Sequence, residues 1–453
     1  MAKTPDIAGG RLRPAEYQEN FSDIAPAFDN NDARVAAERC LFCYDAPCVK
    51  ACPTAIDIPL FIRQIATGNS EGAAKTILDA NIMGGMCGRV CPTETLCEEA
   101  CVREFAEGKP VEIGRLQRFA TDVLFQSGKQ IFTRSSETGR RIAVVGAGPA
   151  GLACAHKLST LGHEVTVLEA KGRPGGLNEY GIASYKTVND FAQREVAYIL
   201  DIGGITIQYG RRLGRDIMLK ALRDSYDAVF LGLGLGAIND LGIGNDVAGV
   251  MNAVDYIALL RQTRDLSQLP VGRRVVVIGG GMTAIDIASQ TKRLGAEDVT
   301  IVYRRGPEHM NASRYEQDLA RTDGVLIRYW MQPRRLIADG GRLIGVELEY
   351  TEESDGKLLG RGEVLEIPCD QFFKAIGQAL EVKDVASHEP YLELEKGRLK
   401  VDAERRTSIG NIWAGGDCVT GGKDLTVAAV EDGKIAALSM DRYLKSLMSA
   451  SAA

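Results

Sequence analysis

Two stretches of the chain show the same succession of apolar and polar positions. In the first, apolar residues 142–145 run directly into Gly146-Ala-Gly148-Pro-Ala-Gly151, an alanine-rich helical pattern follows, and a second apolar strand ends at Glu169. Glycines at this spacing let the backbone approach a pyrophosphate at a helix N-terminus, and the closing acid can accept ribose hydroxyls. The order of strand, glycine turn, helix, strand and acid predicts a Rossmann-like dinucleotide site.

The second stretch repeats this order with one change in the chemistry. An apolar run over 275–278 meets Gly279-Gly-Gly281-Met-Thr283, Ala284 takes the place of the third glycine, and the second strand ends in Arg304 and Arg305. Because an acid suits a free 2′-hydroxyl and an arginine suits a 2′-phosphate, we expect the two sites to bind different dinucleotides. The alternative for the two arginines is a solvated strand end.

A late segment completes the pattern. Residues 411–417 read Asn-Ile-Trp-Ala-Gly-Gly416-Asp417, and a helical pattern begins near Thr426. With the second dinucleotide unit inserted into the first, this arrangement resembles that of flavoprotein reductases. The resemblance implies FAD at the first site and a nicotinamide cofactor at the second, with Asp417 at the ribityl chain and the helix from Thr426 facing the flavin ring. A simple turn residue is the alternative for Asp417.

Cysteines are concentrated near the N-terminus. They form two groups of four. A proline follows the last cysteine of the first group, and another lies within the second group. Between the groups, residues 56–82 have apolar positions at helical spacing. The first group is close to the ferredoxin run, in which one cysteine serves a different cluster from the other three. The prediction is a small helical domain with two [4Fe-4S] clusters, and the alternatives are zinc or eight inert buried thiols. The two groups are Cys40, Cys43, Cys48 and Cys52, and Cys87, Cys91, Cys97 and Cys101.

The other three cysteines, Cys154, Cys369 and Cys418, form no C-x-x-C pair. A redox-active dithiol is therefore not expected, and packing is the simplest role for them. Hydride transfer between nicotinamide and flavin needs orientation but no acid or base, so we expect no catalytic side chain.

Composition narrows the class of protein. The 453 residues are 45% hydrophobic and 25% charged with a formal charge of −6, which is ordinary for a globular protein and argues against a nucleic-acid partner. No apolar run reaches the roughly 20 residues of a membrane-spanning helix, and the N-terminus lacks the apolar stretch of a secretory signal. We therefore expect a cytoplasmic protein without membrane contact.

The predicted fold class is α/β, with two nested Rossmann-like domains preceded by an all-α domain. We expect a helical iron-sulfur domain over 1–135, an FAD-binding domain over 140–270 and 375–453, and an NAD(P)-binding domain over 271–374. A nicotinamide delivers two electrons and a cluster accepts one, so a flavin between them can convert pairs into single electrons. No FMN-binding barrel follows, and the final acceptor is expected to be another subunit.

Several segments of the sequence resemble the dihydropyrimidine dehydrogenases. The segments are RCLFCYDAPCVKACPTAIDIPLFI, GAAK, CGRVCPTETLC and IGRLQRFATD. The resemblance is strongest to the electron-input chain of the bacterial two-subunit enzymes. It implies an FMN-containing partner subunit that reduces uracil or thymine, in a heteromer expected to be a heterotetramer. The small subunit of glutamate synthase shares the plan and is the first alternative, and a silent cluster-bearing scaffold is the second.

The resemblance also implies a set of cluster ligands. In dihydropyrimidine dehydrogenases a glutamine replaces one cysteine sixteen residues after the last cysteine, which here is Gln117, whereas glutamate synthase subunits tend to carry glutamate. Cys87 would then be spare, although counting thiols alone would make it a ligand, and Gln117 by itself would be only a polar surface residue. The implied sets are Cys40, Cys43, Cys48 and Cys101 for one cluster, and Cys52, Cys91, Cys97 and Gln117 for the other.

Cofactor contacts are implied in the same way. Two positions depart from the family: Ala183 stands where relatives usually have proline, and Asn311 stands where the mammalian enzyme has another arginine at the 2′-phosphate. The choice between NADH and NADPH therefore stays open. The implied FAD contacts are Gly146, Gly148, Gly151, Glu169, Gly176, Leu177, Lys186, Gly416, Asp417 and Thr426. The implied nicotinamide contacts are Gly279, Gly281, Thr283, Arg304, Arg305 and Ala375 to Gly377.

Overall fold

The structure is a computed structural model that describes residues 7–243, 246–381 and 391–451. Its contacts divide the chain into two compact units. The first consists of Met1–Ile24, Tyr180–Val188 and Ile238–Gln378, and the second consists of Ala25–Glu179, Asn189–Ala237 and Ala379–Ala453. The chain passes between the units in α10 (Leu177–Tyr180) and in the short strands β6 (Ala237–Ile238) and β16 (Gln378–Ala379).

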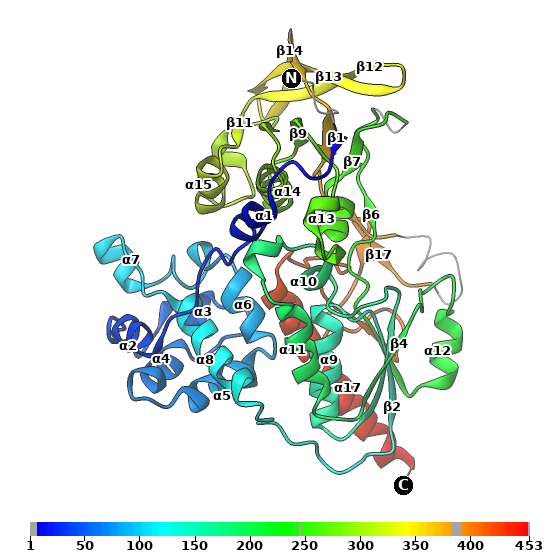
Figure 1. The fold of residues 1–453 in the computed structure, drawn as a ribbon. Coiled ribbons are helices and arrows are strands. Elements are labelled where there is room, and N and C mark those ends of the chain that lie inside the picture. Colours follow the sequence, from blue (N-terminus) through cyan, green and yellow to red (C-terminus); the bar gives the residue numbers. More distant parts are fainter. Residues whose placement is uncertain (1–6, 244–245, 382–390, 452–453) are drawn as a thin grey trace. The chain divides into compact units, whose positions relative to one another are not determined.

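The second unit begins with a group of helices that contains no strand between residues 25 and 127 (Figure 1). Side chains that accept backbone N–H groups start several of these helices: the Asp29 carboxylate accepts from Asn31 N at 2.8 Å, and Asn69 accepts from Gly72 N at 2.9 Å. Glycines 108 and 128 end two others in the left-handed conformation. The helices are α2 (Asn30–Glu38), α3 (Pro47–Ala51), α4 (Ile58–Ala66), α5 (Ser70–Ala80), α6 (Gly84–Val90), the 3₁₀ turn η1 (Thr93–Thr95), α7 (Val102–Glu107) and α8 (Ile113–Ser127).

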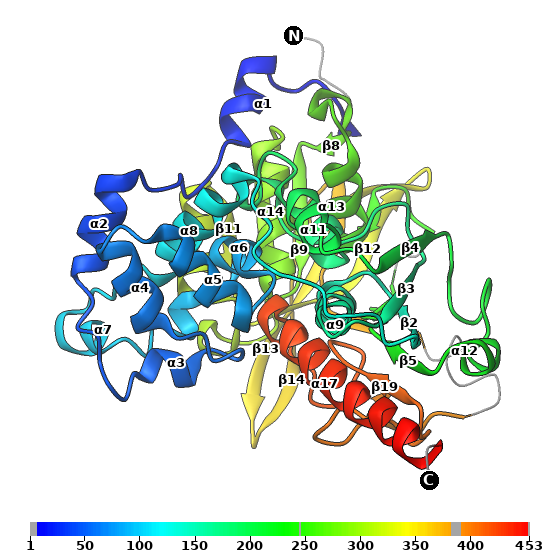
Figure 2. The same cartoon turned by 90° about the horizontal axis from the view of Figure 1, so that it is seen from below.

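A parallel five-stranded sheet forms the rest of the second unit, in the order β19-β5-β2-β3-β4. Helix α17 (Thr426–Ser451) lies alongside α9 (Pro149–Thr160) in both views (Figures 1 and 2). The two helices pack closely because a Cβ at Gly433 would lie 2.1 Å from the Ala150 carbonyl oxygen. The strands are β2 (Arg141–Val145), β3 (Glu164–Glu169), β4 (Ile205–Tyr209), β5 (Ala228–Leu231) and β19 (Ile412–Ala414), with helices α11 (Phe191–Leu200) and α12 (Leu219–Ser225) and the small hairpin β17 (Leu394–Glu395) and β18 (Arg398–Leu399).

The first unit contains a second parallel five-stranded sheet, in the order β11-β10-β9-β15-β7. A three-stranded antiparallel sheet extends from it, and β1 (Ile7–Ala8) pairs with β8 (Val271–Gly272). The strands are β7 (Val250–Asn252), β9 (Arg274–Ile278), β10 (Asp298–Val302), β11 (Leu326–Arg328) and β15 (Gln371–Lys374), then β12 (Met331–Asp339), β13 (Arg342–Ser354) and β14 (Lys357–Pro368). The helices are α1 (Pro14–Asn20), α13 (Ala253–Gln262), α14 (Met282–Arg293) and α15 (Arg314–Thr322), with 3₁₀ turns η2 (Ser184–Lys186), η3 (Leu266–Gln268) and η4 (Pro307–His309).

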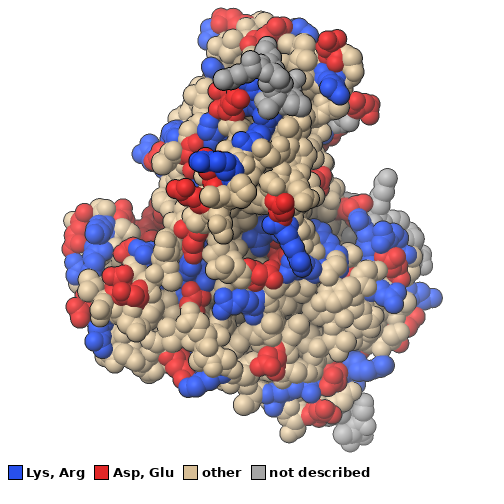
Figure 3. Space-filling view, viewed as in Figure 1, with Lys and Arg blue, Asp and Glu red and all other residues tan. Residues whose placement is uncertain are grey.

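The predicted fold class is confirmed: a helical segment precedes two nested α/β units, each built on a parallel sheet. Residues 7–24 belong to the first unit, together with the sheet that contains β9. The helices of 25–127 belong to the second unit, together with the sheet that contains β2. The three-domain boundaries at 135, 270 and 375 stay a prediction. Figure 3 shows Lys and Arg interspersed with Asp and Glu over the face in view, in keeping with the small net charge.

Candidate functional site

Four cysteines that lie far apart in the sequence line one cavity of the second unit. Cys40 and Cys43 lie in the loop after α2, Cys48 lies in α3, and Cys101 immediately precedes α7. Apolar side chains form much of the remaining wall of this cavity, and they include Ile58, Ile62, Val111 and Ile113. The structure therefore brings together the four cysteines of the first implied cluster set.

The thiols of this group disfavour one another's ionisation. Burial, together with negative charge on Cys101 and Cys40, raises the pKa of Cys48 to about 12. Burial also raises the pKa of Cys40, with Cys43 and Cys101 adding to the effect. Four neighbouring thiolates in a partly buried cavity need compensating positive charge, which bound iron would supply. This donor set fits an iron-sulfur cluster.

The second group gathers around Cys91, at the end of α6. Burial raises the pKa of Cys91 well above its usual value, and charges on Cys87, Cys97 and Cys52 add to the shift. Cys97 is also buried and interacts with Cys52. Four thiols therefore lie near one another here, and Cys87 is one of them. Proximity of cysteines alone does not choose between Cys87 and Gln117 as the fourth ligand.

Gln117 lies on the buried face of α8 and is only 7% exposed, so it is not the surface residue that a lone glutamine would suggest. Its amide Nε2 donates to the Gly84 carbonyl oxygen at 2.7 Å. Because this bond uses the nitrogen, the side-chain oxygen is the atom that remains for a metal. Gly84 begins α6, the helix that carries Cys87 and leads to Cys91.

The spacing of the candidate ligands bears on the zinc alternative. Over 7–243, 246–381 and 391–451, no three His, Cys, Asp or Glu side chains are gathered tightly enough to hold a single metal ion. A zinc ion draws its ligands to within about 2.3 Å of one point, whereas each iron of a cluster takes its own thiolate. The four cysteines line the wall of one cavity, where each can supply a thiolate to a different iron of a cluster.

The first glycine turn has the backbone that close approach to a phosphate requires. Gly146 has φ of 99°, and a Cβ there would lie 2.2 Å from the Gly232 carbonyl oxygen. A Cβ at Gly151 would lie 1.9 Å from the Gly146 carbonyl oxygen. Gly148 immediately precedes α9, and a Cβ there would make ordinary contact at 3.8 Å with Gly176, which itself has φ of 56°. The N-terminus of α9 is thus open for a pyrophosphate, as the fingerprint predicts.

Polar groups line the same end of the sheet. The Glu169 carboxylate, at the end of β3, accepts from Ala147 N and Lys171 N at 2.7 Å each. Burial and, to a smaller extent, the charge of nearby Asp424 raise the pKa of Asp417 to about 7. Gly416 N donates to Asp432 at 2.8 Å, and Thr426 begins α17. A largely desolvated acid, with Arg398 as a nearby favourable charge, can accept hydrogen bonds from hydroxyl groups of a ligand.

The second glycine turn repeats this geometry in the first unit. A Cβ at Gly279 would lie 2.1 Å from the Ala375 carbonyl oxygen, while none of the described residues places an atom within 4 Å of a Cβ at Gly281. Gly281 immediately precedes α14, whose first turn holds Thr283. Gly377, with φ of 88°, accepts a backbone bond from Asn239 at 3.2 Å. Ala375 to Gly377 therefore follow β15 beside the open N-terminus of α14.

Arg304 and Arg305 follow β10, as predicted. The Arg304 side chain is exposed, and the Arg305 guanidinium is 3.8 Å from the Glu353 carboxylate. Arg304 also accepts a hydrogen bond at its backbone oxygen from Thr351 Oγ1 at 2.8 Å. An exposed arginine just after this strand can reach a 2′-phosphate, and this role of Arg304 stays a prediction.

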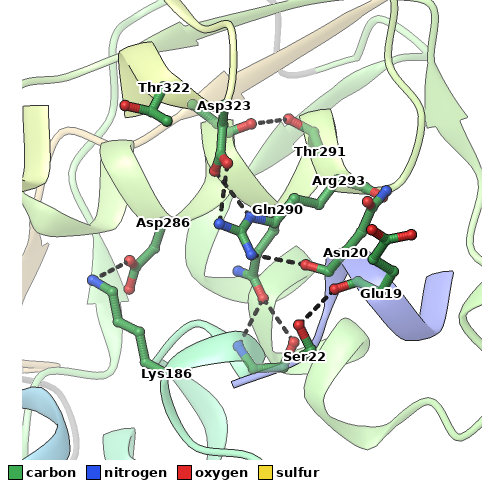
Figure 4. A network of polar contacts seen from close by, with 12 residues as sticks. Glu19, Asn20, Ser22, Lys186, Asp286, Gln290, Thr291, Arg293, Thr322 and Asp323 are labelled. Carbon is green, nitrogen blue, oxygen red and sulfur yellow. Dashed lines mark hydrogen bonds and ion pairs between the residues drawn. The ribbon is translucent and has the colours of Figure 1, made fainter. Parts of the chain in front are cut away.

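Lys186 belongs to the first unit, whereas Gly148 belongs to the second. Its ammonium contacts Asp286 at 2.8 Å and Glu316 at 2.8 Å, and the three side chains are 8 to 11% exposed. Figure 4 shows the lysine pointing at Asp286 of α14. Burial alone would lower the pKa of Lys186, but the two carboxylates outweigh burial and raise it. A contact of Lys186 with FAD stays a prediction.

Sequence reasoning missed two buried residues near the cluster helices. Asn178 follows the implied FAD contact Leu177 and is 2% exposed, and Glu195 on α11 accepts from Met86 N at 2.9 Å. Neither belongs to a recognised motif. Asn178 is followed by Glu179 and Glu195 follows Arg194, so no local pattern of polarity marks either residue. The three isolated cysteines, by contrast, are fully buried as packing predicts.

Comparison with known proteins assigns the two halves of this architecture. Residues 140–433 match the pyridine nucleotide-disulphide oxidoreductases, and residues 17–129 match dihydropyrimidine dehydrogenase domain II, 4Fe-4S cluster. The chain belongs to the family of pyridine nucleotide-disulphide oxidoreductases. The NAD-dependent dihydropyrimidine dehydrogenase subunit PreT of Escherichia coli O157:H7 is 35% identical over 94% of this chain and 98% of its own length. The predicted family resemblance is thereby confirmed.

Two further proteins are similar to the chain, one in sequence and one in fold. The small chain of NADPH glutamate synthase from Escherichia coli K12 is 34% identical over 94% of each chain. The fold is shared with Mycobacterium tuberculosis FprA in complex with NADPH, with a TM-score of 0.58, 19% identity and coverage of 69% of this chain and 86% of that one.

These matches bear out an NAD(P)H-dependent oxidoreductase and support FAD, 4Fe-4S clusters and NAD(P)H as its cofactors. Two of the relatives are named as a subunit or a small chain, which indicates a heteromeric partner. Within the described part of the chain, no helix combines the length and apolar character that a membrane span requires.

Proposed function

We propose that the chain is the electron-input subunit of an NAD(P)H-dependent dihydropyrimidine dehydrogenase. In this role it passes electrons from NAD(P)H through FAD and two [4Fe-4S] clusters to an FMN-containing partner that reduces uracil or thymine to the 5,6-dihydropyrimidines. The observation that carries the proposal is the similarity to the PreT subunit over nearly the full length of both chains.

The two dinucleotide sites have separate tasks in this proposal. FAD, when bound, accepts a hydride and can release its electrons singly. The open N-terminus of α9, with Gly148 and Glu169, would hold its pyrophosphate and ribose, while Asp417 and Thr426 would hold its flavin end. The open N-terminus of α14, with Gly281 and Thr283, would bind the pyrophosphate of NAD(P)H. These chain residues bind and orient, and none is required to move a proton.

The cluster residues are assigned in the same way. Cys40, Cys43, Cys48 and Cys101 would hold one cluster, supported by their common cavity. Cys52, Cys91, Cys97 and Gln117 would hold the other, supported by the burial of Gln117 and by the use of its amide nitrogen in the bond to Gly84. The partner is proposed to carry the substrate chemistry, in a heterotetramer.

The test uses the complete chain purified under argon and loaded with FAD and iron-sulfur clusters. We expect NAD(P)H to bleach the flavin absorption of the chain alone, and uracil or thymine to drive NAD(P)H oxidation only after the FMN-containing subunit is added. An unbleached flavin would support the scaffold alternative instead.

A second candidate function is that of the glutamate synthase small subunit. The observation that favours it is the 34% identity to that chain over 94% of both. Co-purification with a large glutamine-amidotransferase chain, or NAD(P)H-dependent glutamate formation by the reconstituted pair, would establish it and overturn the dehydrogenase proposal. The glutamine at position 117 favours the dehydrogenase.

A further inference from the structure

A buried series of contacts connects the proposed flavin site with the proposed second cluster. Thr426, at the start of α17, donates from Oγ1 to the side-chain oxygen of Asn178 at 2.7 Å. The amide nitrogen of Asn178 donates in turn to the sulfur of Met83 at 3.6 Å. Met83 precedes Gly84, whose carbonyl oxygen accepts from Gln117 at 2.7 Å. All of these residues belong to the second unit.

The series is enclosed by protein. Asn178 is 2% exposed, Met83 is 1% exposed and Gln117 is 7% exposed, and Gly84 is buried as well. Figures 1 and 2 both place the first turn of α17 beside α6. A buried amide without its hydrogen bonds would cost about 1–3 kcal/mol, so both bonds of Asn178 hold its side chain in one orientation. The Asn178 side chain therefore bridges the start of α17 and the residue that precedes α6.

We propose that Asn178 is a positioning residue that holds the start of α17 at a fixed distance from the Met83–Gly84 segment, and thereby sets the rate at which electrons reach the second cluster. This inference rests on the proposed function. Oxidation of one NAD(P)H to NAD(P)⁺ releases two electrons as a hydride. Two clusters take up one electron each, and one proton is released to water. Asn178 takes no part in the bond changes.

The neighbouring residues of the segment fit this role. Gly84 and Gly85 bring α6 close to its surroundings, since a Cβ at Gly84 would lie 2.3 Å from Ile77 and one at Gly85 would lie 2.6 Å from Phe191. Glu195 accepts from Met86 N at 2.9 Å and so holds the first turn of α6 as well. A segment held this tightly transmits a change in the position of Asn178 rather than absorbing it.

Two nearly isosteric substitutions remove the link. Asn178→Leu removes the side-chain bonds to Thr426 and Met83, and Met83→Leu removes only the sulfur that Asn178 contacts, in a swap that cores tolerate well. Lys434→Met is the matched control, because Lys434 of α17 donates to the Ala80 carbonyl oxygen at 3.0 Å and so connects α17 to the cluster helices outside the series. FAD and iron content of each complete, reconstituted chain is measured first.

Each protein is then mixed with NADH or NADPH under argon, and flavin bleaching and the EPR signal of reduced clusters are followed in time. We expect flavin bleaching to stay within about twofold of wild type in all three variants and cluster reduction to slow by roughly tenfold in Asn178→Leu and Met83→Leu. The double variant should be no slower than Asn178→Leu, since both changes break one link. Lys434→Met should match wild type.

Three results would overturn the inference. They are cluster reduction at the wild-type rate in Met83→Leu and Asn178→Leu, equal slowing by Lys434→Met, and loss of FAD or iron from both leucine variants, which would make the link purely structural. Failure of the proposed function looks different. In that case the wild-type chain itself would bind no FAD, or its flavin would not be bleached by NAD(P)H, while dithionite would still reduce its clusters.

Discussion

Lys186→Met should destabilise the first unit more than any surface change could. The ammonium lies 2.8 Å from Asp286 and 2.8 Å from Glu316, and all three side chains are at most 11% exposed (Figure 4). Methionine keeps most of the side-chain volume but removes the positive charge. Two carboxylates then remain in a poorly hydrated site without the ammonium that offsets them.

The size of the effect follows from this burial. Removing one partner of a buried ion pair costs about 3–5 kcal/mol, because the other charge stays desolvated. In a unit of this size such a loss lowers the melting temperature by on the order of 10 °C. The control is the exposed pair of Arg361 and Glu363, whose side chains are 48% and 65% exposed. Arg361→Met should change the free energy of unfolding by less than about 1 kcal/mol.

The chain offers a way to observe each unit separately. Its two tryptophans are Trp330 and Trp413, which lie in the first and second units respectively. Urea unfolding followed by Trp330 fluorescence in a Trp413→Phe background therefore reports on the unit that holds Lys186. Adding Asp286→Asn and Glu316→Gln to Lys186→Met should restore most of the lost stability, because neutral amides carry a much smaller desolvation cost.

The contrary result is equally specific. If Lys186→Met left unfolding of the first unit unchanged but reduced FAD content, the lysine would serve the flavin, as the family resemblance implies. The reasoning from the buried ion pairs would then be wrong. A failure of the two amide substitutions to restore stability would also contradict it.

Three other substitutions test separate parts of the molecule. Arg304→Glu should raise the KM for NADPH about tenfold or more and that for NADH far less, since a charge-assisted contact is worth about 1.5–3 kcal/mol; equal effects would mark a mere surface charge. Gln117→Ala should lower the iron content while Cys87→Ala should not, and the reverse would make Cys87 the ligand. Burial lowers the pKa of His156 to about 3, so the unfolded chain takes up a proton below about pH 6.5 and stability falls as the pH drops toward 3. His156→Leu should therefore remove about 2 kcal/mol of the stability difference between pH 7.5 and pH 5 in urea unfolding, and an unchanged difference would refute this assignment.

Much of the fold could be predicted because its signals are local. Each glycine turn, with the strand before it and the helix after it, lies within one short segment, and the close contacts at Gly146 and Gly279 leave no room for a side chain. The helical spacing of 56–82 likewise corresponds to α4 and α5. Such patterns depend on backbone geometry within a few residues, so they can be recognised from the sequence alone.

Other features depend on which distant segments pack together, and only the tertiary structure decided them. It placed Cys101 in the cavity of Cys40, Cys43 and Cys48, where spacing alone had left the grouping of the cysteines open. It placed Lys186 next to two acids, Asp286 and Glu316, that follow it by 100 residues or more, and it joined Asn178 to Met83 across 95 residues. A polar residue in a sequence reveals that it needs a partner when buried, but only folding determines which partner it meets.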